Sequence, residues 1–353
     1  MQQKNGHRLV KNVLQSCLYG FLLLITAQMT YAQGDAGYRV LREIHIGGKG
    51  GWDYIAVNPE LKRLYVSHDT LVNILDETTG DSIGVIPNTV GVHGIAFATP
   101  FGKGFTSNGR ANTVTAFDLK TNQVLGQVST GKNPDAIIYE PFSKTIMTCN
   151  GRSQDATVID PSTDSVVHTI ALGGRPETPA SDGAGNIYVN IEDKNEIVHI
   201  NAKTFAVEHR WSIGKGDSPA GLAIDRKTNR LFIGCGNKLM VVMNTENGKV
   251  LAELPIGDRC DGTAFDAGTG YAFASNGDGT LTMVKEENAD SFRVVTNVPT
   301  KRGARTLTVD DQMHHVFLPT AQFGEAPPPT AEHPRPRPPI VPGSFEVLEV
   351  GGK

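Results

Sequence analysis

A motif of about forty residues recurs along most of the chain, and this repeat limits the fold more than any other feature of the sequence. One copy, at 103–131, reads KGFTSNGRANTVTAFDLKTNQVLGQVSTG. Apolar and β-branched residues alternate with small polar ones at 105–107 and 113–117, which is the period of a strand with one buried face. Turn residues separate these segments at 108–112 and follow them at 118–122. Each copy therefore predicts antiparallel strands joined by tight turns.

Seven copies align on the apolar residue that lies before the first turn. The aligned residues are Tyr65, Phe105, Met147, Tyr188, Phe232, Phe273 and Phe317. Successive copies lie 40 to 44 residues apart, a length typical of one blade of four short strands. The sequence therefore predicts an all-β fold, a seven-bladed β-propeller.

The two ends of the repeat array predict how the ring closes. A strand at 38–46 precedes the first full blade, whereas the last blade has no fourth strand after Lys353. We expect the N-terminal strand to complete the last blade, which leaves no open sheet edge. Because single blades cannot bury their faces alone, residues 33–353 are expected to form one domain.

The strand that carries the aligned residue resembles the signature strand of a known family. RLYVS at 63–67, NIYVN at 186–190 and RLFIG at 230–234 are similar to the repeats of the YVTN-type 40-residue-repeat β-propellers of secreted bacterial proteins. The resemblance covers nearly all of the chain after residue 32. It implies the propeller fold and an exported protein, but it implies no single activity, because propellers host unrelated functions.

The first 32 residues have the composition of a secretory signal peptide. Lys4, Arg8 and Lys11 precede an apolar run at 18–25, and small residues lie before Gln33. The apolar run is much shorter than the ~20 residues that span a bilayer. We therefore expect a signal peptide at 1–32, export to the periplasm or the medium, and no membrane span after its removal.

The charge of the chain bears on its partners. The formal net charge is −4, and because segment 1–32 carries three basic and no acidic residues, the remainder stands at −7. A mildly acidic protein lacks the attraction that drives binding to phosphate backbones. Nucleic acid is therefore not an expected partner. A small molecule or another exported protein is expected instead, bound by a monomer.

A proline-rich insertion interrupts the last blade at 321–343 and includes Arg335 and Arg337. Proline has no backbone N–H for a β ladder, so we expect an extended, polyproline-like loop. The loop should leave the blade on the face where the innermost strands begin. Two interpretations stay open, a surface insertion and a lid over a binding site.

The first residue of each innermost strand is expected to face the mouth of the central channel. The aligned position holds Asp53, His93, Asp135, Glu177, Ala220, Asp261 and Arg305. The ends of the next strands bring further polar residues to the same face, namely His68, Asn108, Asn150 and Asn276. Carboxylates, imidazoles and amides that converge on a funnel are typical of a polar-ligand or metal site, although a water-filled channel of mixed charge remains the alternative.

A divalent metal is a hypothesis for this mouth, with Asp53, His93, Asp135, Glu177 and Asp261 as candidate ligands. Oxygen ligands suit Ca²⁺ or Mg²⁺, whereas His68 and His93 leave a transition metal open. A gluconolactonase-like hydrolase or lyase would use such an ion, with Glu177 or Asp135 as base. The motifs of that class are absent from the sequence. The leading prediction is therefore a non-catalytic propeller that binds a small ligand or a partner protein at the channel mouth, and the metal-dependent enzyme is the alternative.

Two further features allow more than one interpretation. Trp52, next to Asp53, could stack on a flat ligand or pack between blades. Cys235 and Cys260 fall on the same face of neighbouring blades and could form a disulfide, although free buried thiols are the favoured interpretation.

Overall fold

The computed structural model describes residues 37–330 and 336–352. Within these residues, 28 strands form seven four-stranded sheets, and every paired strand is antiparallel to its neighbour. The predicted all-β, seven-bladed β-propeller is therefore confirmed. The expected signal peptide at 1–32 lies outside the described residues.

Six blades are built from consecutive strands, which follow one another from the innermost to the outermost position. Blade 1 comprises β2 (Ile55–Asn58), β3 (Arg63–His68), β4 (Leu71–Asp76) and β5 (Ser82–Ile86). Blade 2 comprises β6 (Val92–Ala98), β7 (Lys103–Asn108), β8 (Thr113–Asp118) and β9 (Val124–Ser129). Blade 3 comprises β10 (Pro134–Glu140), β11 (Thr145–Asn150), β12 (Asp155–Asp160) and β13 (Ser165–Ala171).

The second half of the ring repeats this order. Blade 4 comprises β14 (Pro176–Ser181), β15 (Asn186–Ile191), β16 (Glu196–Asn201) and β17 (Val207–Ser212). Blade 5 comprises β18 (Pro219–Asp225), β19 (Arg230–Cys235), β20 (Leu239–Asn244) and β21 (Val250–Pro255). Blade 6 comprises β22 (Cys260–Asp266), β23 (Tyr271–Asn276), β24 (Thr280–Asn288) and β25 (Ser291–Pro299). Blade 7 comprises β26 (Thr308–Asp310), β27 (His315–Thr320), β28 (Glu346–Gly351) and β1 (Arg39–His45). Two short 3₁₀ turns, Thr99–Phe101 and Glu192–Lys194, lie in connections.

Polar side chains close the turn between the third and fourth strands of a blade. In blade 2, Asp118 Oδ1 accepts hydrogen bonds from the backbone N–H groups of Lys120 (3.0 Å) and Thr121 (2.7 Å). Equivalent bonds reach the side-chain oxygens of Asp76, Asp160, Asn201 and Asn244. An Asp or Asn that accepts from the N–H two residues later stabilises a tight turn, which explains why these residue types recur here.

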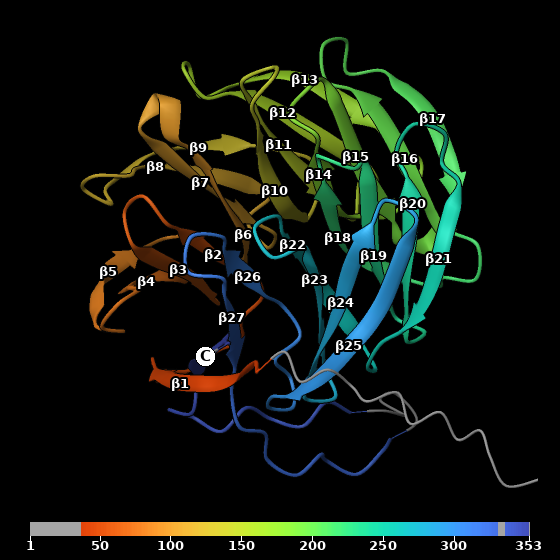
Figure 1. The fold of residues 1–353 in the computed structure, drawn as a ribbon. Helices are drawn as coiled ribbons and strands as arrows, with labels where there is room; N and C mark the ends of the chain where they lie inside the picture. Colours follow the sequence, from red (N-terminus) through yellow and green to blue (C-terminus); the bar gives the residue numbers. More distant parts are fainter. Residues whose placement is uncertain (1–36, 331–335, 353) are drawn as a thin grey trace, which may run out of the picture. The chain divides into compact units, whose positions relative to one another are not determined.

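The innermost strands contact one another in order around the ring, and β26 contacts β2 to close it (Figure 1). The hydrophobic core lies between adjacent blades. One cluster, for example, packs Tyr65, Val72 and Ile74 of blade 1 against Ile95 and Phe117 of blade 2. The seven aligned apolar residues of the repeat are all at most 2% exposed. Stacking of blades therefore accounts for the apolar pattern of the sequence.

The N-terminal strand β1 pairs with β28 and forms the outer edge of blade 7, as predicted. Ile44 of β1 is 4% exposed and packs with Phe317 and Val347 of the same blade. Arg42 binds Glu349 through Nε (2.8 Å) and donates to the backbone oxygens of Thr78 (2.7 Å) and Glu77 (2.8 Å) in blade 1. The two ends of the chain are thus joined within one sheet and tied to the next blade.

The proline-rich loop, 321–343, leaves blade 7 after β27 on the face where the innermost strands begin. Its two described stems meet through one isolated bridge, Phe323 with Ile340, and through hydrogen bonds from Gly324 N to Pro339 O (2.8 Å) and from Val341 N to Gln322 O (2.9 Å). The ring centroids of Phe323 and Trp52 lie 6.0 Å apart. The guanidinium carbon of Arg302 lies over the Phe323 ring, 5.7 Å from its centroid. The described stems of the loop therefore lie beside Trp52 at the channel mouth.

Two more predictions concern cysteines and membranes. Cys149, Cys235 and Cys260 are buried free thiols, so no disulfide joins Cys235 to Cys260 in the structure. Among residues 37–330 and 336–352, no helix has the length and apolar character needed to cross a bilayer.

Candidate functional site

Irregular pairing occurs at the start of five innermost strands, at the aligned position predicted to face the channel. The register of β6, β10, β14, β18 and β22 shifts within the first residues of each strand. A bulge turns a side chain out of the regular alternation of a strand. It therefore frees residues such as His93, Asp135 and Asp261 from packing between blades.

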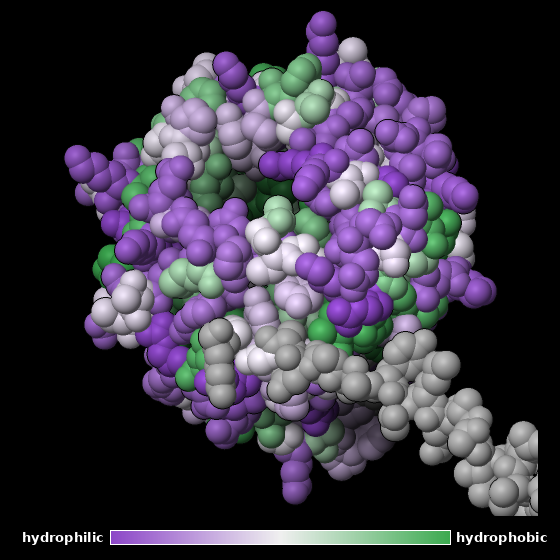
Figure 2. Space-filling model, in the orientation of Figure 1, coloured by the Kyte–Doolittle hydropathy of each residue, from purple (hydrophilic) through white to green (hydrophobic). Residues whose placement is uncertain are grey.

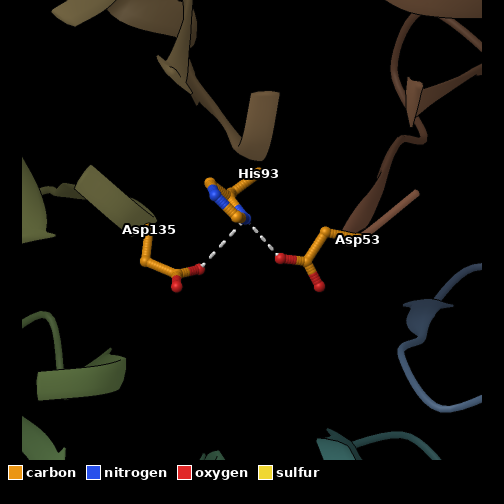
Figure 3. A group of neighbouring side chains, drawn as sticks. All are labelled: Asp53, His93 and Asp135. Carbon is orange, nitrogen blue, oxygen red and sulfur yellow. Dashed lines mark hydrogen bonds and ion pairs between the residues drawn. The ribbon is translucent and has the colours of Figure 1, made fainter. Parts of the chain in front are cut away.

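Three of the predicted residues form a compact group at the mouth, which we call the Asp–His–Asp cluster (Figure 3). His93 Nδ1 lies 2.6 Å from Asp53 Oδ2 and 3.7 Å from Asp135 Oδ1. The three side chains come from blades 1, 2 and 3 and point toward one another. Each is only partly exposed, with 18% of the side chain accessible for both aspartates and 26% for His93. Their donor atoms all lie within 4.8 Å of one another.

Arg305 extends this cluster to the other side of the mouth. Its Nη1 lies 3.0 Å from Asp53 Oδ1 and 2.5 Å from Asp261 Oδ2, and its Nη2 donates to the backbone oxygen of Trp52 at 3.2 Å. The hydroxyl of Thr306 donates to the backbone oxygen of Asp53 at 2.5 Å. Charged contacts therefore run without a break from Asp135 through His93, Asp53 and Arg305 to Asp261.

The surroundings set the protonation of this network. Burial acts to lower the pKa of His93, but the hydrogen bond to Asp53 and the charges of Asp135 and Asp53 raise it to about 8. Burial acts to raise the pKa of Asp53, yet His93 and Arg305 hold it below its usual value. Burial and the charge of Asp53 raise the pKa of Asp135 to about 7. Near neutral pH the cluster thus holds a charged imidazolium between two carboxyl groups.

Glu177 and Ala220 occupy the aligned position but lie outside the chain of contacts. Glu177 Oε1 is 4.0 Å from the Nε of Arg175, whose Nη2 binds Glu192 at 2.6 Å. Burial, the charge of Asp135 and a hydrogen bond with Glu192 raise the pKa of Glu177 to about 10. Ala220 contributes only a backbone oxygen, which accepts from Asn190 Nδ2 at 3.0 Å.

The asparagines predicted to converge on the mouth instead form hydrogen bonds within their own blades. Asn108 Nδ2 donates to Thr113 Oγ1 (3.1 Å) and Thr115 Oγ1 (2.8 Å), and Asn150 and Asn276 make equivalent bonds to the third strand. All three are fully buried. The structure does not bring them to the Asp–His–Asp cluster, because a residue at the end of an inner strand reaches the next strand of its own sheet first.

His68 is also absent from the cluster. It is 7% exposed, its ring lies 4.5 Å from the ring of Phe345, and its Nδ1 is 3.1 Å from Asn73 Nδ2. Burial lowers its pKa. His68 therefore packs against Phe345 of blade 7 and does not join the Asp–His–Asp cluster.

A cavity of about 580 Å³ adjoins the network on the side of blades 6, 7 and 1, and we call it the arginine cavity. Asp261 and Arg305 form the wall that it shares with the network. The rest of its lining comes from loops before the inner strands and from the proline-rich loop, and includes Trp52, Arg259, Arg302, Phe323, Arg337, Pro338 and Ile340. Arg259 and Arg302 were not predicted from the sequence, because they lie outside the aligned positions. In the sequence, the two arginines of the proline-rich insertion were the only indication of this cavity.

Trp52 packs between blades, as one of the two interpretations expected, and it also lines the cavity. Its ring stacks on Phe345 at 5.4 Å between centroids, which is packing against blade 7. It also lines the arginine cavity. A ligand in the cavity would therefore meet one edge or face of a fixed aromatic ring.

Comparison with known proteins supports the fold. No family model matches the chain, and no curated protein matches its sequence. Similar solved structures include hydrazine synthase of Kuenenia stuttgartiensis, 16% identical with a TM-score of 0.68, where the match covers 83% of this chain and 95% of that one. The structure of U3-55K is 12% identical with a TM-score of 0.71, covering 89% and 98%. The RRP9 WD40 repeats are 11% identical with a TM-score of 0.72, covering 90% and 98%. At these identities the likeness shows the propeller fold alone.

Proposed function

We propose that this protein is an exported propeller of the YVTN type that binds a small ligand in the arginine cavity. One observation carries the proposal: a cavity of about 580 Å³ lies at the channel mouth, beside the charged network and under the stems of the proline-rich loop. Small-molecule sites in proteins typically measure about 300–1,000 Å³ and combine apolar walls with a few placed polar groups. Export rests on the composition of residues 1–32.

A small ligand explains the mouth better than a docked protein. The aromatic residues at the mouth line a cavity and do not form an exposed patch. Figure 2 shows one face of the ring, which is mostly hydrophilic, with hydrophobic residues in small patches and inside a hollow. Protein-binding sites usually expose a larger continuous apolar patch. The aromatic residues of the mouth, Trp52 and Phe323, line the cavity instead.

The proposal is tested by filling the cavity. Gly51 lines it, and a Cβ added there meets no atom within 4 Å, so Gly51→Phe adds bulk without a clash at the backbone. Gly126, in the outer strand β9 of blade 2, has the same freedom and makes Gly126→Phe a matched control. A fragment library is screened by thermal melting, since a ligand of the native state raises its melting temperature. We expect compounds that stabilise the parent and Gly126→Phe but not Gly51→Phe. If every stabilising compound acts equally on Gly51→Phe, the cavity is not the site.

A second candidate function, metal-dependent hydrolysis or elimination, is favoured by the Asp–His–Asp cluster. One imidazole nitrogen and two carboxylates within 4.8 Å fit the mixed nitrogen and oxygen ligands of Mn²⁺ or Zn²⁺ better than the all-oxygen sites of Ca²⁺ or Mg²⁺. When bound, such an ion would polarise a carbonyl and acidify water. The metal-dependent function ranks second because a protonated His93 and Arg305 already bind the two carboxylate oxygens of Asp53.

This candidate has its own test. Elemental analysis of the purified protein is combined with titration of Mn²⁺, followed by its electron paramagnetic resonance. Saturable binding of one ion that disappears in Asp135→Asn, but persists in a variant of the remote carboxylate Asp164, would support the metal site. Absence of bound metal together with non-saturable titration would eliminate it.

A further inference from the structure

The arginine cavity is basic, although the chain as a whole is acidic. Among the described residues, its lining includes four arginines, Arg259, Arg302, Arg305 and Arg337, and one carboxylate, that of Asp261. The whole chain has 33 Lys and Arg against 37 Asp and Glu. An excess of one sign of charge within a concave site raises the local concentration of oppositely charged ligands. The described lining of this cavity therefore has an excess of positive charge, whereas the chain as a whole has a net negative charge.

The four arginines are not equivalent. Arg305 is committed to the network, because its guanidinium binds both Asp53 and Asp261 and donates to Trp52. In residues 37–330 and 336–352, no ion pair joins Arg259, Arg302 or Arg337 to a carboxylate. Arg259 uses Nη2 to donate to Gly277 O at 3.1 Å, which leaves most of its five N–H groups available.

These three arginines reach the cavity from three separate segments. Arg259 precedes β22 in blade 6, Arg302 lies between β25 and β26, and Arg337 belongs to the second stem of the proline-rich loop. A single exposed arginine is ordinary on a protein surface. Three without carboxylate partners around one cavity form a set of donors that an anionic group can satisfy together.

The apolar part of the lining lies next to these donors. Arg302 lies over the face of Phe323, 5.7 Å from its ring centroid, which holds the guanidinium at the edge of the aromatic wall. Trp52 lies 6.0 Å from Phe323, and Ile340 pairs with Phe323 across the stems of the loop. A ligand would thus meet flat apolar surface on one side and guanidinium groups on the other.

We propose that the ligand of the arginine cavity is a small molecule with a flat apolar body and an anionic carboxylate or phosphate group. This inference rests on the proposed function and specifies its ligand. Arginine binds both kinds of oxyanion in a bidentate manner, and aromatic walls favour a planar body. A cationic ligand would instead face three guanidinium groups that no ion pair with a described carboxylate neutralises.

Three matched probes test the charge requirement, namely 2-naphthoate, 2-naphthyl phosphate and the neutral 2-naphthamide. Binding is measured by calorimetry to the full chain and to Arg302→Gln, Arg337→Gln and Gly51→Phe. Arg293→Gln is the control, because Arg293 lies on the outer strand β25, where it pairs with Glu287. We expect the anions to bind about tenfold or more tightly than the amide. Each cavity arginine variant should also lose about tenfold or more in affinity for the anions, which is about what one charge-assisted hydrogen bond contributes.

Salt provides a further readout that a purely apolar site would not show. Raising the ionic strength from about 0.01 M to about 1 M shortens the screening length from about 30 Å to about 3 Å, so anion binding should weaken while amide binding should not. Preference for naphthoate over naphthyl phosphate, or the reverse, identifies which oxyanion the site takes.

The outcomes separate the two proposals. If the amide binds as tightly as the anions and Gly51→Phe abolishes all binding, the cavity is a ligand site and the anion requirement is wrong. If all three probes bind Gly51→Phe as well as the parent, the proposed site itself is wrong. If the anions bind more tightly but Arg302→Gln and Arg337→Gln match Arg293→Gln, the arginines do not carry the selectivity and the inference is overturned.

Discussion

His93 Nδ1 lies 2.6 Å from Asp53 Oδ2, although 40 residues separate the two in the chain. The bond joins the innermost strands of blades 1 and 2 at the channel mouth. The other oxygen of Asp53 lies 3.0 Å from Arg305 of blade 7. The carboxylate of Asp53 therefore links blades 1, 2 and 7, where the ring closes. We expect the charges of His93 and Arg305 to contribute to the free energy of unfolding.

The first prediction concerns pH and His93. Because its pKa is raised to about 8 in the folded protein, against about 6.5 in the unfolded chain, protonation of His93 stabilises the fold. This contribution is fully present below pH 6.5 and is lost as the pH rises through 8. At about 1.4 kcal/mol for each pKa unit, it amounts to about 1–2 kcal/mol.

Urea unfolding at pH 6 and pH 9 measures this contribution. The free energy of unfolding of His93→Gln should fall less between the two pH values than that of the parent. His168→Gln, at an exposed position of β13, should behave as the parent does. An equal fall in His93→Gln would show that His93 does not titrate as described.

The second prediction concerns Arg305. Arg305→Met leaves Asp53 and Asp261 without their guanidinium partner, and we expect a loss of about 1–3 kcal/mol, below the 3–5 kcal/mol typical of fully buried pairs because Arg305 is partly exposed. Because Arg305 acts to lower the pKa of His93, that pKa should rise further in the variant. Denaturation and NMR titration of the imidazole measure the two effects. Unchanged stability and an unchanged His93 titration would contradict the described network.

The third prediction concerns ring closure by β1. Ile44 is 4% exposed, so Ile44→Ala should cost about 2–4 kcal/mol through lost burial and a cavity. Leu41 lies on the same strand but is 38% exposed, and Leu41→Ala should change stability by about 0.5 kcal/mol or less. Equilibrium unfolding in urea compares them. Similar small costs for both variants would mean that β1 does not contribute to the core of blade 7.

The fourth prediction concerns a buried acid at the seam between blades 1 and 7. Glu77 is 3% exposed, and burial together with a hydrogen bond to Asp310 raises its pKa to about 8. A raised pKa means that stability present at low pH is lost as the pH rises through 8. Glu77→Gln should therefore resemble the parent at pH 5 and be more stable at pH 9, with thermal melting as the measurement. A variant that is less stable than the parent at pH 9 would refute this.

The fold could be predicted from the sequence because the repeat encodes it several times over. The copies share the same alternation, and blades 1 to 5 share an Asp or Asn at the outer turn. The prediction therefore did not depend on any single copy. Closure by β1 followed from the missing fourth strand of blade 7. These features depend on local pattern and on chain order, and both are visible in a sequence.

The site could be predicted only in part. The aligned position selected Asp53, His93, Asp135 and Arg305, which the structure joins in one chain of contacts. His93 and Asp135 lie in the first residues of β6 and β10, whereas Asp53 and Arg305 lie just before β2 and β26. The same reasoning failed for Asn108, because alignment does not tell whether a side chain faces the channel or the next strand of its own blade. The arginine cavity depends on which loops approach one another, and that distance is set only by the folded ring.

The most direct test of the central claim uses the two tryptophans of the chain, Trp52 in the wall of the arginine cavity and Trp211 in β17 of blade 4. Two-dimensional ¹H–¹⁵N NMR follows their indole N–H signals during titration with 2-naphthoate, and Trp211→Phe assigns them. We expect a saturable shift of the Trp52 signal alone, which is lost in Gly51→Phe and retained in Gly126→Phe. A titration that leaves the Trp52 signal in place, or shifts it equally in Gly51→Phe, would contradict a ligand site at the mouth.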